Sequence, residues 1–162
     1  MFDIYQYSEM LARSLKAVNH TDRKCPYYEA TEQTELQELE QNSSNASGTI
    51  LIAIDGQVSN YSFMADNLIE LPTYSIVIAK QTKATDARSV TIAQKQCKQI
   101  IDQVIAKILC DAHHNRNDCN MVDADTFTTE GFGPIGGLFY GVILSFTVKA
   151  PRAYNIKENM WL

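Results

Sequence analysis

The segment from residue 87 to 110 constrains the fold most, because its apolar residues recur at the spacing of one helix face. Asp86 precedes it at the position of an N-cap, and polar residues such as Lys95 and Lys98 fall on the other side. A helix of about 24 residues is about 36 Å long, enough to cross a small sheet. We expect it to pack on the sheet through Ala93, Cys97, Ile100, Ile101, Val104, Ile105, Ile108 and Leu109.

The other elements follow from apolar periodicity and turn residues. A second amphipathic pattern predicts a helix over residues 4–18, with Asp3 and Gln6 as a capping box. Asp55-Gly56 suits a hairpin turn between the β-branched run 49–54 and a return strand reaching about Phe63. Further strands are expected from Pro26, over 74–79, over 126–130 and over 138–149, with the last two joined through Gly131, Gly133, Gly136 and Gly137.

This order of elements predicts the fold class. We expect an α+β fold, with a mostly antiparallel sheet of four to five strands packed by one long amphipathic helix and an N-terminal helix. At 162 residues the chain has the length of a single domain.

Two segments are expected to lie outside the packed body. Five glutamates occur between residues 29 and 40 without a Lys or Arg, and a Ser/Asn-rich stretch follows, so residues 29–48 are predicted to form an exposed acidic loop. Its channel-facing or partner-facing candidates are Glu32, Glu35 and Glu38. The tail at 150–162 ends in Met160, Trp161 and Leu162, which either fold back on their own core or form an oligomer or partner interface.

Composition narrows the function classes. The longest apolar runs have about six residues, too few for a membrane-spanning helix, and the N-terminus does not resemble an export signal. We therefore expect a cytoplasmic protein whose four cysteines are reduced. The net charge of −5, with no clustered basic patch, argues against tight binding of nucleic acid.

Two motifs suggest chemistry and are weighed against simpler interpretations. Gly131, Gly133 and Gly136 have dinucleotide-binding spacing, but a β-rich run follows instead of a helix, which favours a glycine-rich strand connection or bulge. Four potential zinc ligands, Cys110, His113, His114 and Cys119, lie within ten residues at a helix end, where a solvated terminus is the simpler explanation. The prediction is a non-enzyme without catalytic residues, metal or cofactor.

The stretch 74–79, the helix 87–110 and the glycine, aromatic and apolar pattern of 136–151 carry a family resemblance. From about residue 49 onward, the chain resembles the tail-terminator and neck proteins of long-tailed bacteriophages. The resemblance implies a ring, commonly of six subunits, that stops growth of the tail tube and joins it to the head. Its partners would be tail-tube and neck proteins, with DNA passing transiently through the channel. Such a protein would be made in the host cytoplasm and become part of the virion.

Two alternatives remain open. The first is another phage head-completion or mobile-element assembly protein. The second, from a different class, is a zinc-dependent enzyme or regulator that uses Cys110, His113, His114 and Cys119.

Overall fold

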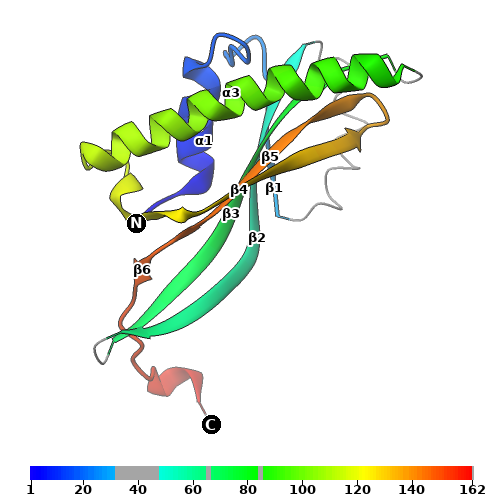
Figure 1. The fold of residues 1–162 in the computed structure, drawn as a ribbon. Coiled ribbons are helices and arrows are strands. Elements are labelled where there is room, and N and C mark those ends of the chain that lie inside the picture. The colour runs from blue at the N-terminus through cyan, green and yellow to red at the C-terminus, as the bar shows by residue number, and fades with distance from the viewer. Residues whose placement is uncertain (32–47, 65–66, 84–85, 162) are drawn as a thin grey trace.

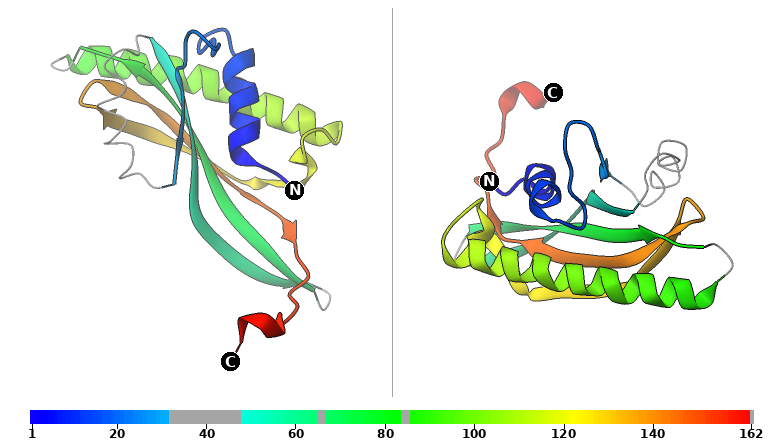
Figure 2. Two further views of the ribbon diagram at one scale, coloured as in Figure 1. Left: turned by 180° about the vertical axis from the view of Figure 1, so that it is seen from behind. Right: turned by 90° about the horizontal axis from the view of Figure 1, so that it is seen from above.

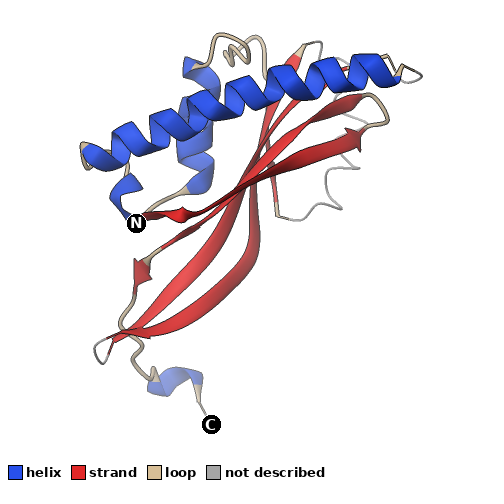
Figure 3. Cartoon of the chain, in the orientation of Figure 1, coloured by secondary structure: helices blue, strands red, loops and turns tan. Residues whose placement is uncertain are grey.

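The computed structural model describes residues 1–31, 48–64, 67–83 and 86–161, and it places a twisted mixed sheet against two helices (Figures 1 and 3). The predicted α+β class is confirmed, although the sheet has six strands instead of four to five. In chain order the elements are α1 (Ile4–Ser14), β1 (Tyr27–Ala30), β2 (Thr49–Met64), β3 (Asn67–Gln81), α3 (Ala87–His113), η3 (Cys119–Met121), β4 (Val122–Ile135), β5 (Phe139–Val148), β6 (Ala150–Pro151) and η4 (Glu158–Met160).

The sheet has the strand order β1-β2-β3-β5-β4, and the short β6 pairs with β3. All neighbouring strands are antiparallel except β1, which runs parallel to β2. The strand expected from Pro26 is therefore present as β1, and it runs parallel to its neighbour in a sheet that was expected to be mostly antiparallel.

Both helices pack against the same face of the sheet. Asp86 caps α3 by accepting a hydrogen bond from the backbone N–H of Arg88 at 3.0 Å, as the sequence predicts. The helix crosses β3 and β5 diagonally, whereas α1 lies over β2 (Figure 2). Burial of the facing apolar side chains removes them from water and holds the layers together. The core on this face includes Leu11, Leu51, Ile76, Ile101, Val104, Ile108, Leu144 and Phe146.

A second apolar cluster occupies the opposite face of the sheet. Because strand side chains alternate between faces, the residues next to the first core point to this side. The cluster consists of Ala30, Ile50, Ile52, Ile54, Val77, Ala79, Ile135, Phe139 and Ile143, all of them buried. The predicted strands are thus apolar on both faces at the centre of the sheet.

Two helix predictions need correction. The first helix ends at Ser14 instead of residue 18, because Leu15 adopts an extended conformation, yet Val18 still reaches the core from the following turn. The second correction concerns the long helix, which continues to His113. Its apolar stripe is narrower than predicted, since Leu109 is 46% exposed.

Among the helices that the structure describes, none combines the length and the apolar character of a membrane span.

The predicted hairpin turn at Asp55-Gly56 is wrong. The strand register shifts between the pairs Asp55–Tyr74 and Val58–Thr73, so the extra residues form a bulge and β2 continues to Met64. Within the bulge, Gln57 has a φ of 54° and donates its backbone N–H to Asp55 Oδ1 at 3.0 Å. The Asp side chain therefore supports a local turn without reversing the chain.

The glycine-rich stretch does form a strand connection with a bulge, as predicted. Gly131 and Gly133 lie in β4, where the register with β5 shifts between Phe132 and Ile135. Gly136 and Gly137 form the turn into β5, with φ values of 62° and 66° that favour glycine.

Candidate assembly surface

The β2–β3 hairpin extends well beyond the body of the sheet. Pairing of β1 with β2 ends at Ile54, and pairing of β5 with β3 ends at Thr73, so residues 58–64 and 67–72 project as a two-stranded arm (Figure 1). The β6 strand adds only two pairs, to Ile69 and Glu70 of β3. No described strand pairs with the outer edge of β2 beyond Ile54. This edge is available for pairing with another chain.

Large apolar side chains are exposed along the arm. Tyr61 and Phe63 are two residues apart on β2 and therefore share one face, and Phe63 is 73% exposed. Val58 is also exposed, on the other face. Exposed aromatic residues gathered on a projecting hairpin are typical of an interaction site.

The polypeptide after β6 continues along the arm as an exposed tail, defined here as residues 152–161. The ring of Tyr154 contacts that of Tyr61 edge-on, with centroids 6.2 Å apart. Arg152 forms an ion pair with Glu70 at 2.6 Å, and Ser59 Oγ donates to the same carboxylate at 2.8 Å. These contacts fix the start of the tail to the arm.

The end of the tail is more exposed. Met160 and Trp161, two of the predicted interface residues, are 75% and 73% exposed, whereas Leu162 lies outside the described residues. Of the eleven large apolar side chains exposed among the described residues, seven belong to the arm or the tail: Val58, Tyr61, Phe63, Tyr154, Ile156, Met160 and Trp161. Exposed apolar surface is thus concentrated at one end of the molecule.

A pocket of about 240 Å³ lies where the arm joins the body. Its wall combines the N-terminal segment, the base of the arm and the end of β5, through Phe2, Pro72, Tyr74, Met121, Val148 and Ala150. Charged residues on its lining are Asp118, Lys149 and Arg152. The pocket is therefore an apolar depression with charges of both signs beside it.

The predicted acidic candidates are mostly outside the described structure. Glu32, Glu35 and Glu38 cannot be placed, because they belong to the undescribed stretch 32–47. The prediction that the acidic loop begins at Glu29 is wrong, because Glu29 belongs to a strand. It lies in β1, where its Oε1 is 3.1 Å from the Tyr27 hydroxyl oxygen.

The potential zinc ligands do not converge. Cys110 and His114 are exposed and contact each other at 3.7 Å between Sγ and Nδ1, but Cys119 is buried. Burial raises the pKa of the Cys119 thiol to about 11, which disfavours the thiolate that binds metal. No group of three or more His, Cys, Asp or Glu side chains in the described part of the chain is arranged to hold a metal ion.

Cys119 instead borders a buried polar network that sequence reasoning missed. Asp111 is fully buried near the end of α3, where Lys107 Nζ lies 2.5 and 2.6 Å from its two carboxylate oxygens. The Tyr7 hydroxyl of α1 donates to Asp111 Oδ2 at 3.0 Å. Burial, and after it Cys119 and Asp111, raise the pKa of Tyr7, so this hydroxyl stays protonated. The network thus links the two helices.

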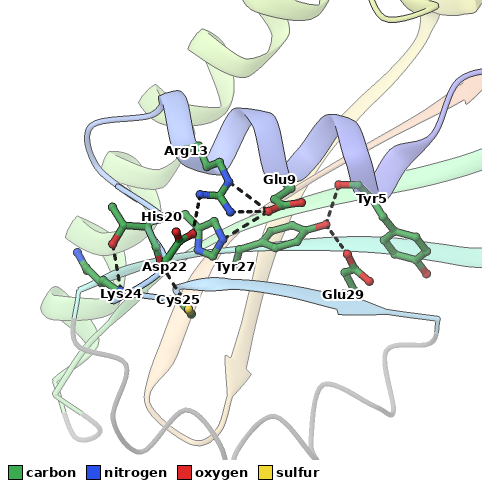
Figure 4. A network of polar contacts seen from close by, with 10 residues as sticks. Tyr5, Glu9, Arg13, His20, Asp22, Lys24, Cys25, Tyr27 and Glu29 are labelled. Carbon is green, nitrogen blue, oxygen red and sulfur yellow. Dashed lines mark hydrogen bonds and ion pairs between the residues drawn. The ribbon is translucent and has the colours of Figure 1, made fainter.

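A second polar network anchors α1 to β1 (Figure 4). Glu9 accepts two hydrogen bonds from Arg13, at 2.8 and 3.1 Å, and lies 3.8 Å from His20 Nε2. The Tyr27 hydroxyl donates to the backbone oxygen of Tyr5 at 2.8 Å. Because Arg13 also pairs with Asp22, the network ties the connecting segment to the helix. Its contacts explain how β1 is held beside α1.

Comparison with known proteins adds no relative. No protein-family model, curated protein or solved structure matches the chain.

The sequence of the arm differs from that of the buried strands. Val58, Tyr61 and Phe63 belong to a run in which polar and apolar residues mix without the dense apolar pattern of 49–54. Such a run is typical of a strand with two solvent-facing sides. The Asp-Gly dipeptide before it predicts a chain reversal, but the structure has a bulge there, and the hairpin is therefore longer than the sequence indicates.

Proposed function

We propose that the chain is a structural subunit that assembles through its arm and tail. The observation that carries the proposal is the projecting hairpin, with exposed aromatic side chains and an unpaired strand edge in the described structure. A monomer would leave both the apolar side chains and the edge groups in water. Association with another chain would bury the apolar side chains and pair the backbone groups of the strand edge.

We further propose that the subunits form a ring and that this ring is a neck or tail component of a long-tailed bacteriophage. It would resemble a tail terminator, join the tail tube to the head and surround the channel through which DNA passes. This assignment rests on the pattern of residues 74–79, 87–110 and 136–151, together with the α+β fold that accompanies it. The net charge of −5 supports it physically, because an acidic subunit does not retain the phosphate backbone.

The assembly role is tested by replacing the aromatic pair on the arm. Tyr61→Ser with Phe63→Ser should leave the melting temperature nearly unchanged, because both side chains are exposed in the monomer. The same variant should lose most of the association that light scattering detects for the native chain. The matched control is Ile92→Ser with Leu109→Ser, two exposed apolar residues on α3 that should leave association intact.

Two results would contradict the proposal. A native chain that remains monomeric at high concentration and beside tail-tube and neck proteins would exclude the assembly role. Equal association of the arm variant and the α3 control would exclude the arm as the interface. Electron microscopy of the assembled protein then tests the ring itself, for which we expect a closed particle with a central channel.

A further inference from the structure

The exposed tail and the pocket at the base of the arm are complementary features at different places on the molecule. Trp161 and Met160 are large apolar side chains without cover in the described structure. The pocket offers apolar walls from Phe2, Tyr74 and Val148. We propose that the tail of one copy docks in the base pocket of the next copy, with Trp161 as the inserted side chain.

The size of the pocket favours a side chain as its occupant. Small-molecule sites usually have volumes of about 300–1,000 Å³ and enclose most of their ligand. At about 240 Å³, this pocket lies below that range. An aromatic side chain provides a large apolar contact area at a low cost in conformational entropy, and Trp is enriched among the residues that dominate interfaces.

Charges do not select the partner of the pocket. The tail carries Lys157 and Glu158 shortly before Met160 and Trp161, and both charged side chains are exposed. Beside the pocket, Arg152 pairs with Glu70, Lys149 with Asp123, and Asp118 with the amino group of Met1. Because these charges are already balanced within the chain, the apolar contact of Trp161 has to supply the affinity.

The path of the tail argues for docking between copies. The pocket lies at the root of the tail, where Ala150 and Arg152 line it. From there the tail runs outward along the arm, held by the contact of Tyr154 with Tyr61, and its end lies farther from the body than the described part of the arm (Figures 1 and 2). Docking within one chain requires reversal of the tail between residues 155 and 160. The tail of a neighbour requires none.

Such a contact is heterologous, because it joins different surfaces of the two copies. A head-to-tail contact closes into a ring when the rotation between neighbours allows it. The inference therefore rests on the proposed ring function and specifies one of its subunit contacts. The exposed face of the arm that carries Tyr61 and Phe63 lies beside the tail and would enlarge the contact between copies.

The test uses two complementary variants of the full chain. Trp161→Ala removes the inserted side chain, and Ala150→Leu narrows the pocket. Each variant alone should associate about tenfold or more weakly than the native chain, as expected for loss of a central interface residue. An equimolar mixture should form dimers and nothing larger, because it contains one intact tail and one intact pocket per pair. Leu109→Ala is the control and should associate like the native chain.

Thermal melting establishes that each variant is folded, and Met121→Arg replaces Ala150→Leu if the latter is not. Dimers in the mixture, with monomers in each separate sample, support the inference. Association of Trp161→Ala equal to that of the native chain would overturn it while leaving the ring function standing. A mixture that stays monomeric would also overturn it. A native chain that never associates would contradict both the contact and the proposed function.

Discussion

At Gly141, the close approach of two strands leaves no room for a side chain. A Cβ atom at this position would lie 1.8 Å from the backbone oxygen of Ile78 and 2.6 Å from the Cα of Ala79. Both contacts are with backbone, so no side-chain rotation can relieve them. Glycine is thus a requirement of packing between β3 and β5.

We expect Gly141→Ala to lower the free energy of unfolding by about 3 kcal/mol or more, because the neighbouring strand has to move. The control is Gly131→Ala, where a Cβ would meet only the flexible side chain of Gln94, at 3.1 Å. That change should cost less than about 1 kcal/mol. Urea unfolding of both variants measures the difference, and equal midpoints would show that the strands are not so close.

Asp111 and Asp102 allow buried and exposed ion pairs to be compared on one helix. Each aspartate pairs with the lysine four residues before it, Lys107 and Lys98 respectively, but only Asp111 is buried. Burial by itself raises the pKa of Asp111, whereas hydrogen bonds from Lys107 and Tyr7 outweigh it and leave the pKa below its ordinary value. A carboxylate with a depressed pKa stabilises the fold above its unfolded pKa of about 3.9.

Asp111→Asn should therefore lower the free energy of unfolding by about 1–3 kcal/mol at neutral pH, because it removes a buried charge partner of Lys107. The difference from the native chain should be constant above about pH 5 and shrink as the pH falls below about 4. Asp102→Asn should change stability by less than about 0.5 kcal/mol. Urea titrations at several pH values measure this, and a difference independent of pH would contradict the assigned pKa.

Among the elements, α3 provides the clearest separation between core and surface. The sequence places Ile101 and Leu109 on one apolar stripe, but in the structure Ile101 is buried and Leu109 is 46% exposed. We expect Ile101→Asp to destabilise the protein by several kcal/mol through an unpaired buried carboxylate. Leu109→Asp should change stability by less than about 0.5 kcal/mol. Equal melting temperatures for the two variants would show that the helix is rotated differently.

The two helices and the central strands could be predicted because their signals are local. Apolar spacing identified both helices, and Asp3 and Asp86 act as caps at the predicted ends. The end of α1 could not be predicted from the apolar pattern, because apolar residues up to Val18 continue that pattern after the backbone has left the helix. The buried turn after α1 therefore has the same apolar spacing as one more turn of helix would have.

The arm and the buried network could not be predicted, because both depend on contacts between distant residues. Asp55-Gly56 is compatible with a reversal or a bulge, and only the pairing of β2 with β3 distinguishes them. Similarly, Asp111 lies beside cysteine and histidine in sequence, but its partner Tyr7 comes from the other end of the chain. The potential zinc ligands and the buried polar network are therefore adjacent in sequence but lie in different environments.

At the scale of the whole molecule, packing and exposure are divided between two regions. The body buries two apolar clusters on the two faces of the sheet. The arm and tail contain seven exposed large apolar side chains, and the arm extends beyond the points where β1 and β5 stop pairing with its two strands. This division is expected of a subunit whose body folds alone and whose extensions are ordered further by neighbours.

The central claim is that these extensions join copies of the chain into a closed assembly. Native mass spectrometry of the full chain over a range of concentrations tests it most directly. We predict one oligomer of fixed stoichiometry, with six subunits as in most rings of the family that the sequence resembles. This oligomer should coexist with monomer and not with a series of larger species. A monomer at every concentration, or an open series of increasing oligomers, would contradict the claim.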